Sequence, residues 1–294
     1  MPELPEVETI RRSLEKNLVG KSVSFVRILE AKQFIGDPKK IEGEKIVRLD
    51  RRGKVLSIIF SNNFVLSIHL KLTGQILLAN NKDQAIFRNT IPRADTTQMP
   101  GKTTRVTIEF IDASALYFND LRKFGWMKLS QNIEEPQSVD VLSTDFTTAL
   151  LYSKTKNSKK PIKVLLMDQE VIAGLGNIYA NDSLWEAKIS PLVRANELSE
   201  KEVTNLHMAI KKIIDEGIAH KGSSAKDEIY ILPDSSPGKY QHYFKVYHQH
   251  GKPCKRCGTT IVRVKQAGRS TFYCPRCQAT HTVLPQSVKD QPLF

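Results

Sequence analysis

The sequence has little cysteine, no long apolar segment and comparatively few acidic residues. No apolar run approaches the roughly 20 residues that a membrane-spanning helix requires. The first residues, MPELPEVE, are acidic and lack the apolar core of a secretory signal, so we expect neither membrane association nor secretion. Asp and Glu number 31 against 44 Lys and Arg, a formal net charge of +13. This excess predicts a polyanionic partner such as nucleic acid; the alternative is that the basic charge serves solubility alone.

All four cysteines lie within 24 residues and form two C-x2-C pairs separated by sixteen residues. They are Cys254, Cys257, Cys274 and Cys277. Two such pairs complete a tetrahedral thiolate shell with no open position, which predicts one structural zinc ion rather than a catalytic one. The alternative, two disulfides or free thiols, is disfavoured because an intracellular protein holds few disulfides.

The segment around the cysteines is strongly basic. No Asp or Glu occurs between Gly251 and Lys289. The sequence IVRVKQAGRSTFYC predicts two short strands around Ala267-Gly268, with Arg269 at or just beyond the turn. A hairpin this short is marginal alone, so we expect the metal to hold it together and the hairpin to present Arg269 to phosphate.

Apolar spacing divides the 294 residues into two parts, in agreement with the roughly 150 residues expected of a domain. Residues 5–19 have helical spacing and Gly20 is a natural stop. Residues 22–130 are rich in β-branched and aromatic residues separated by turn residues, which predicts an antiparallel β-sandwich or barrel with one leading helix. Residues 131–145 are polar and acidic, and they are the best linker candidate.

From Phe146 onward the pattern is helical. The lysine-rich residues 154–163 predict a loop or helix start that faces phosphate, or else a solvated basic loop. Ser199 and Glu202 form a capping box that predicts a helix from Glu200. Residues 221–245 are rich in Gly, Ser, Asp and Pro, which is typical of a mobile loop.

Pro2 is a candidate nucleophile. A small second residue permits removal of Met1, which would leave a secondary amine. An α-amino group has a pKa of about 7.7–8.0 against about 10.4 for lysine, so an appreciable fraction is neutral near pH 7.5. Such an amine can attack a sugar C1′ and form an iminium, while Glu3 and Glu6 act as acid, base or electrostatic stabiliser. The alternative is that Pro2 only begins the helix and the acids interact with its dipole.

Four separated motifs resemble the formamidopyrimidine-DNA glycosylases of the bacterial Fpg/Nei family. They are PELPEVET at the start, DLRKFG at 120–125, GLGNIYAND at 174–182 and the cysteine hairpin with Arg269. The resemblance runs from Pro2 to about Gln278. It implies an α+β protein of two domains, an N-terminal antiparallel β-sandwich with a leading helix and a helical helix–two-turn–helix domain with a zinc β-hairpin.

Together these patterns predict boundaries for each part. We expect a catalytic β-sandwich over 2–130, a linker over 131–145 and a helix–two-turn–helix domain over 146–225. After these we expect a lesion-side loop and connection over 226–247, a zinc hairpin over 248–282 and a tail over 283–294.

The resemblance implies a base-excision repair enzyme that removes 8-oxoguanine and formamidopyrimidines from duplex DNA and cuts the strand by β,δ-elimination. By position, Pro2 is the implied nucleophile and Glu3 the proton donor and acceptor. Glu6 resembles the helper carboxylate that supports the sugar, and Lys54 the lysine near the reacting sugar and phosphates. Arg269 resembles the arginine that grips the phosphates flanking the lesion.

Further residues are implied contacts to DNA. Asn177, Lys163 and Lys159 correspond to phosphate contacts, and a helix that starts near Asn177 offers free N–H groups to an anion. Extrusion of a base costs a few kcal/mol and leaves a gap. Arg122 is implied to pair with the orphaned base and Phe124 to wedge into the stack, although on the residues alone Phe124 reads as a core aromatic.

Some positions depart from the family pattern. Lys71 and Leu72 stand where Gly and Met are usual, and Leu72 would replace the third side chain that fills the void. Thr103 stands where a DNA-contacting His is usual, which puts that contact in doubt. Asp182 stands where Glu is common, which puts a lesion-side role in doubt.

Two other functions stay open: an endonuclease VIII-like glycosylase for oxidised pyrimidines, and a non-catalytic protein that binds damaged DNA. In either case we expect a monomer on double-stranded DNA in the bacterial cytoplasm, associated with the nucleoid.

Overall fold

The computed structural model describes residues 1–87, 97–131, 138–224 and 230–279. The chain forms two compact units, and each contains two separate stretches of sequence. Unit 1 comprises residues 1–137 and 214–243, and unit 2 comprises residues 138–213 and 244–294. In the described ranges no helix is both long and apolar enough to span a membrane.

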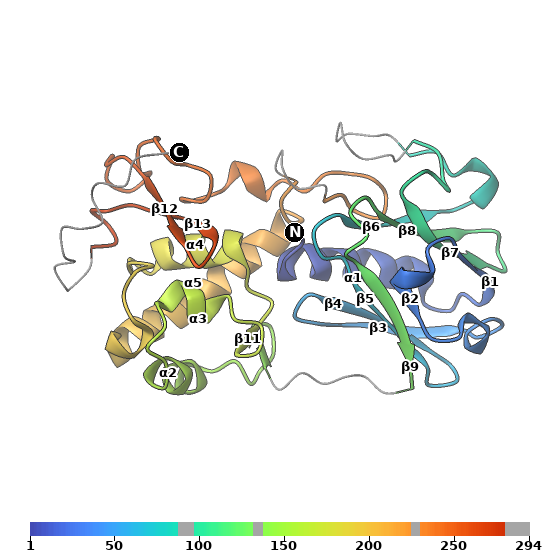
Figure 1. The fold of residues 1–294 in the computed structure, drawn as a ribbon, viewed down its shortest axis with the longest axis horizontal. Helices are drawn as coiled ribbons and strands as arrows, with labels where there is room; N and C mark the ends of the chain where they lie inside the picture. Colours follow the sequence, from blue (N-terminus) through green and yellow to red (C-terminus); the bar gives the residue numbers. More distant parts are fainter. Residues whose placement is uncertain (88–96, 132–137, 225–229, 280–294) are drawn as a thin grey trace. The chain divides into compact units, whose positions relative to one another are not determined.

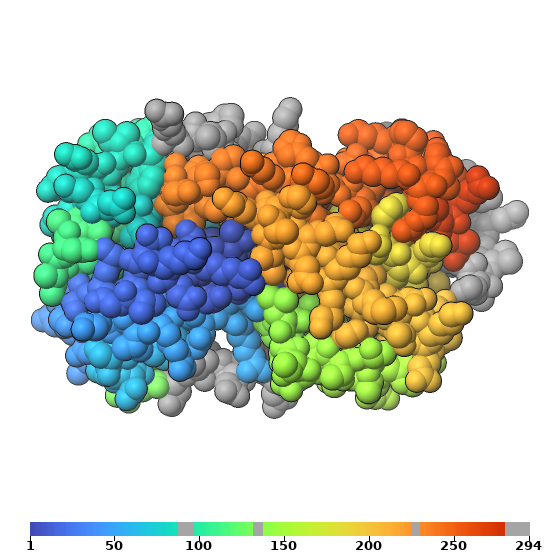
Figure 2. Space-filling view, turned by 180° about the vertical axis from the view of Figure 1, so that it is seen from behind, coloured from blue at the N-terminus to red at the C-terminus, as the bar shows by residue number. Residues whose placement is uncertain are grey.

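Unit 1 begins with helix α1 (Leu4–Leu18), close to the predicted span. Its apolar stripe is fully buried, and the helix ends before Gly20, which has a φ of +91°. On the face in Figure 2, α1 (dark blue) lies along the orange segment of residues 214–243, and Arg12 and Lys221 line a hollow between the two. The N-terminal helix therefore packs against a segment more than 200 residues later in the chain.

Between α1 and residue 131, the described residues contain nine strands joined by turns and short 3₁₀ helices, as the change of periodicity predicted (Figure 1). These are β1 (Val23–Ile28), β2 (Phe34–Ile35), β3 (Ile46–Arg52), β4 (Val55–Phe60), β5 (Val65–His69), β6 (Gly74–Ala79), β7 (Thr104–Phe110), β8 (Ala115–Asp120) and β9 (Trp126–Ser130). They form a four-stranded sheet of order β1-β7-β8-β6 and a five-stranded sheet of order β2-β9-β5-β4-β3. All pairs are antiparallel except the short pair β2–β9.

Both sheets and α1 contribute side chains to one apolar core. Tyr230 and Leu232 also belong to it, and the carbonyl of Pro233 accepts the backbone N–H of Leu78. The division between units thus differs from the sequence-based boundary at residue 225, because this later segment supplies core residues to the N-terminal sheets. In the described part of residues 221–245 the secondary structure is one short 3₁₀ turn, Tyr240–His242, and much of it is buried. The predicted loop also includes residues 225–229, which lie outside the described ranges.

Unit 2 is mainly helical, as predicted. Its elements are β10 (Val139–Asp140), α2 (Thr148–Lys156), α3 (Ile162–Leu166), β11 (Ile172–Ala173), α4 (Asn177–Glu186), the start of α5 (Glu200–Ala219), β12 (Val262–Gln266) and β13 (Arg269–Tyr273). The capping box of α5 is confirmed, because Ser199 N–H donates to Glu202 at 2.8 Å and Glu202 N–H donates to Ser199 Oγ at 3.3 Å. Within the candidate linker, residues 139–140 form a strand paired with β11, and residues 132–137 lie outside the described part.

The predicted hairpin is confirmed. β12 and β13 pair antiparallel around a two-residue turn, in which Ala267 and Gly268 have φ values of +47° and +76°. Two positive φ angles are the signature of a type I′ turn, which matches the twist of the flanking strands. Arg269 is the first residue of β13 and is exposed.

Candidate active site and nucleic-acid interface

The candidate catalytic residues at the N-terminus are buried. Pro2 and Glu3 precede α1, and Glu6 lies in its first turn with no exposed surface. The two oxygens of the Glu6 carboxylate have different partners: Oε2 accepts the backbone N–H of Glu3 at 2.9 Å, and Oε1 accepts the backbone N–H of Ser223 at 2.8 Å. Glu6 therefore fixes the backbone beside Pro2 and connects it to a turn far along the sequence.

That turn is shaped to meet Glu6. Gly222 has a φ of +72°, and a Cβ at this position would lie 2.7 Å from Cγ of Glu6. Tyr230 packs nearby, and its hydroxyl donates to the carbonyls of Lys221 at 3.1 Å and Glu6 at 3.4 Å. Burial and the Glu6 carboxylate hold the pKa of Tyr230 well above its usual value, so the hydroxyl remains a donor. Sequence reasoning missed these partners; the only local signal was a glycine just beyond a predicted helix.

Lys54 lies in the turn between β3 and β4 and is 7% exposed. Its neighbour Val55 pairs with His69, the last residue of β5. Burial, and then the positive charges of Lys71 and Lys54, lower the pKa of His69 to about 4. The imidazole is consequently neutral at neutral pH, and its Nδ1 accepts the backbone N–H of Lys71 at 2.9 Å.

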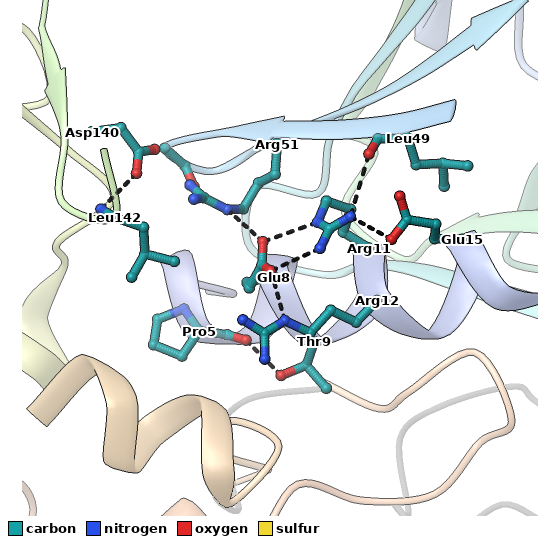
Figure 3. Close-up of polar contacts among 11 residues, drawn as sticks. Pro5, Glu8, Thr9, Arg11, Arg12, Glu15, Leu49, Arg51, Asp140 and Leu142 are labelled. Carbon is teal, nitrogen blue, oxygen red and sulfur yellow. Dashed lines mark hydrogen bonds and ion pairs between the residues drawn. The ribbon is translucent and has the colours of Figure 1, made fainter. Parts of the chain in front are cut away.

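A carboxylate with three arginine partners joins α1 to the adjacent sheet (Figure 3). Glu8 accepts from Arg11 at 3.0 Å, from Arg12 at 2.7 Å and from Arg51 of β3 at 3.0 Å. Burial alone would raise the pKa of Glu8, but these three guanidinium groups outweigh it and lower the pKa to about 2. The strand that leads to Lys54 is thereby fixed to the helix that carries Glu3 and Glu6.

The candidate void-filling residues are at the surface of unit 1. Leu72 is 37% and Phe124 52% exposed. The guanidinium of Arg122 lies 4.7 Å from the centre of the Phe124 ring. Phe124 is therefore not the core aromatic that the residues alone suggested.

Asp182, one departure from the family pattern, has a structural role through its side chain, whereas Thr103, another, makes a backbone contact. The carboxylate of Asp182 is fully buried and accepts the backbone N–H groups of Lys245, Val246 and Tyr247 at 3.0–3.1 Å. It holds the chain that leads into the cysteine segment. The carbonyl of Thr103 accepts the backbone N–H of Asp120 at 2.9 Å.

In unit 2, two candidate phosphate contacts, Asn177 and Lys163, bind β13 of the hairpin close to its turn. Asn177 begins α4, and its Nδ2 donates to the carbonyl of Ser270 at 3.0 Å. The ammonium of Lys163 donates to the same carbonyl at 3.0 Å and to Thr271 Oγ1 at 2.8 Å. Lys163 is 1% exposed, so in this structure it supports the strand that carries Arg269, whereas Lys159 is exposed.

The four cysteines form one cluster, with all four sulfur atoms within 4.8 Å of one another. Tetrahedral zinc with bonds of about 2.3 Å places sulfurs roughly 3.8 Å apart. Cys257 and Cys274 are 3.5 Å apart, and Cys254 and Cys277 4.0 Å, which fits this shell and is far longer than the roughly 2.05 Å of a disulfide bond. Trp185 Nε1 donates to Cys254 Sγ at 3.3 Å and orients a ligand. The site fits one structural zinc ion.

The candidate residues thus fall into two groups. Pro2, Glu3, Glu6, Lys54, Leu72, Arg122 and Phe124 belong to unit 1, and Lys159, Lys163, Asn177, Arg269 and the cysteines belong to unit 2. Two sheets with a buried acidic N-terminus, a helical unit and a hairpin whose four cysteines fit a zinc ion, in a chain of net charge +13, point to the class of zinc-containing proteins that bind nucleic acid.

Comparison with known proteins gives the family. Family models match residues 1–127 (formamidopyrimidine-DNA glycosylase N-terminal domain), 138–228 (formamidopyrimidine-DNA glycosylase H2TH domain) and 251–280 (zinc finger found in FPG and IleRS). The formamidopyrimidine-DNA glycosylase of Pelotomaculum thermopropionicum is 35% identical over 95% of this chain and 99% of its own length. The chain belongs to the formamidopyrimidine-DNA glycosylase family.

Solved structures agree over nearly the whole chain. The MutM (Fpg) protein from Thermus thermophilus has a TM-score of 0.82 at 32% identity and covers 96% of this chain and 100% of its own. A variant of the Lactococcus lactis Fpg protein, in complex with Fapy-dG containing DNA, has a TM-score of 0.81 at 34% identity and covers 95% of this chain and 100% of its own.

Proposed function

We propose that this chain is a base-excision repair DNA glycosylase that removes oxidised purines from duplex DNA and then cuts the strand at the abasic site. Membership of the family, at 35–38% identity to curated members over nearly the full length, supports the glycosylase activity. The related Lactococcus lactis protein bound to Fapy-dG containing DNA supports an oxidised purine as substrate and DNA as partner. The observation that carries the proposal is this full-length family match together with the acidic Pro2–Glu3 start buried in unit 1.

In the proposed mechanism the amine of Pro2, freed by removal of Met1, attacks the sugar C1′. A C1′–N bond forms, the glycosidic bond breaks, and the base departs with the bonding electrons. Glu3 carries protons in base loss and in ring opening, in which the C1′–O4′ bond breaks, O4′ takes a proton and the C1′=N⁺ iminium forms. The resulting iminium acidifies the neighbouring sugar carbon and so permits elimination of the phosphates.

The remaining residues have supporting roles in this proposal. Glu6 acts through position, because its oxygens hold the backbone of Glu3 and of Ser223. Lys54 lies near the reacting sugar and phosphates. Arg122, Phe124 and Leu72 fill the gap left by the extruded base. Phosphates are contacted by Lys159, Asn177 and Arg269, and Lys163 both adds positive charge and holds the strand of Arg269.

Borohydride trapping on DNA with an abasic site tests the nucleophile. Protein that lacks Met1 by mass spectrometry should form a covalent adduct, and peptide mass spectrometry should place the DNA remnant on the nitrogen of Pro2. Pro5→Ala is the matched control, because Pro5 also lies at the start of α1 but has no terminal amine, so its adduct should be unchanged. An adduct on a lysine side chain with Pro2 unmodified would refute the assignment.

A second candidate substrate is an oxidised pyrimidine, since a further structure of the Lactococcus lactis protein contains an oxidised pyrimidine in its DNA. Single-turnover release of 8-oxoguanine and of thymine glycol from matched duplexes decides between the two substrates. Absence of both products and of any adduct would favour the non-catalytic binding protein. We further propose a monomer that works on nucleoid DNA in the bacterial cytoplasm, by analogy with its bacterial relatives.

A further inference from the structure

Asp120, the last residue of β8, has no exposed surface and receives four hydrogen bonds. Its Oδ2 accepts the backbone N–H of Gly125 at 2.7 Å and Nε2 of Gln33 at 2.8 Å. Its Oδ1 accepts the hydroxyl of Thr73 and the backbone N–H of Arg122 at 3.2 Å. An ionised carboxylate accepts about four hydrogen bonds and donates none, so these four donors fill its acceptor positions.

Three of these four donors come from two loops that carry the exposed apolar residues, and the fourth, Gln33, lies in the short 3₁₀ turn Ala31–Gln33. Thr73 follows Leu72 in the connection between β5 and β6, and Arg122 and Gly125 flank Phe124 in the connection between β8 and β9. The hydroxyl oxygen of Thr73 also accepts the backbone N–H of Arg122 at 2.9 Å, which links the loops directly. One buried carboxylate is therefore a shared anchor for both loops.

Both loops contain backbone that needs such an anchor. Lys71 and Lys123 have φ values of +50° and +57°, a left-handed region that costs a non-glycine residue roughly 1–2 kcal/mol. A Cβ on Gly125 would lie 2.8 Å from Cζ of Phe118 and 3.0 Å from Oδ2 of Asp120, so the chain approaches the carboxylate as closely as glycine allows. Strain of this kind persists where the surroundings fix the conformation.

We propose that Asp120 is a positioning residue that locks the two loops into one wedge, so that Leu72, Arg122 and Phe124 enter the DNA stack together. This inference rests on the proposed function. A wedge ordered before binding avoids the entropy cost of arranging loops at the moment when base extrusion already costs a few kcal/mol.

Asp120→Asn tests the proposal with little change of volume. Whichever way the amide points, its NH₂ group faces one backbone N–H, that of Gly125 or that of Arg122, and loses that hydrogen bond. We expect single-turnover excision from a duplex to fall about 10- to 100-fold, because a displacement of about 1 Å at a positioned group has effects of this size. Fluorescence of 2-aminopurine placed opposite the lesion, which reports unstacking, should rise less than with wild type.

Single-stranded DNA with an abasic site separates positioning from chemistry. It offers no stack to wedge, so elimination there by Asp120→Asn should stay within about twofold of wild type. Asp112→Asn is the control, since Asp112 lies in an exposed turn bonded to Lys21 and Ser114. If Asp120→Asn is poorly folded in a thermal scan, Thr73→Val and Thr73→Ser decide: removal of the hydroxyl should reproduce the duplex defect and serine should restore activity.

Wild-type excision by Asp120→Asn, or a parallel loss on single-stranded abasic DNA, would overturn the positioning role. Equal excision by Thr73→Val and Thr73→Ser would do the same. A wild-type protein that is inactive on both substrates would instead refute the proposed function, so the two failures are distinguishable.

Discussion

Lys71 illustrates how one residue sets the geometry of a functional loop. Its φ of +50° is unfavourable for lysine, and the neutral ring of His69 compensates in part by accepting its backbone N–H at 2.9 Å. The sequence left open whether Lys71 adds a phosphate contact or crowds the turn. The backbone angle suits the glycine that the resemblance implies at this position, because glycine adopts this conformation without steric cost.

A comparison of two substitutions at Lys71 measures this strain. Lys71→Gly should change the free energy of unfolding by less than about 1 kcal/mol, because relief of strain offsets the greater freedom of the unfolded chain. Lys71→Val should destabilise by about 2 kcal/mol, because a β-branched residue is a genuine outlier at positive φ. Urea unfolding measures both. Lys128 in strand β9 is the control: there the valine variant should be more stable than the glycine variant, the reverse of the order at Lys71. Equal stability of the two Lys71 variants would contradict the strain argument.

Asp182 shows what single-residue comparison with a family cannot reveal. Its shorter side chain raised doubt about a role near the lesion. The structure shows a carboxylate that accepts three backbone N–H groups from residues 63 to 65 positions later. The same holds for Glu6 and Ser223, which are 217 positions apart. Backbone partners at such distances leave no side-chain pattern in the sequence.

At the scale of elements, local patterns predicted α1, the strands of the two sheets, the capped start of α5 and the position of the turn in the zinc hairpin. Each depends on neighbours in the sequence: a helical stripe, an alternation, a capping box, an Ala-Gly turn. The parallel pair β2–β9, the pair β10–β11 and the packing of residues 214–243 with unit 1 were not predicted. These features depend on contacts between distant segments, which periodicity does not encode.

The attachment of α1 to β3 through Glu8 predicts a dependence of stability on pH. The folded-state pKa of about 2 lies below the ordinary value of 4.5, so Glu8 stabilises the protein above pH 4.5 and loses this contribution as the pH falls toward 2. Solvent screening limits the expected contribution to about 1–2 kcal/mol. Glu8→Gln should be less stable than wild type at pH 7 by this amount, and the difference should shrink between pH 4.5 and 2.

Unfolding followed by circular dichroism at a series of pH values checks the prediction. The difference between the two proteins isolates Glu8 from other acid-labile groups, including the zinc thiolates. Asp50→Asn provides the control, because Asp50 pairs with Arg48 at the surface, where such pairs contribute about 0–1 kcal/mol. A constant difference between Glu8→Gln and wild type from pH 7 to 2 would show that the three arginines do not act through the charge of Glu8.

The whole molecule carries a net charge of +13, and the sequence alone connected this excess to a polyanion. The family motifs then gave the substrate class, because they combine the residues proposed as nucleophile, wedge and phosphate contacts, which no single periodicity could identify. Composition thus indicated the kind of partner, and the motifs indicated the family and its substrate. The buried carboxylates of Glu6, Asp120 and Asp182, which hold the motifs in place, could be identified only from the structure.

Because several cations neutralise phosphates, binding to DNA should weaken steeply with salt. Each neutralised phosphate contributes about −0.9 to the slope of log K against log salt concentration for B-DNA. Arg269→Ala should make this slope shallower by about one for duplexes with and without a lesion, because a phosphate contact carries no base information. Lys82→Ala should leave it unchanged, since Lys82 is already paired with Glu109 at 2.5 Å. Fluorescence anisotropy between 50 and 200 mM salt measures the slopes. Over this range about 6–10 phosphate contacts change the affinity about 10³- to 10⁵-fold. A slope near zero for wild type would exclude the assigned phosphate contacts. An unchanged slope for Arg269→Ala would show that the hairpin does not contact phosphate.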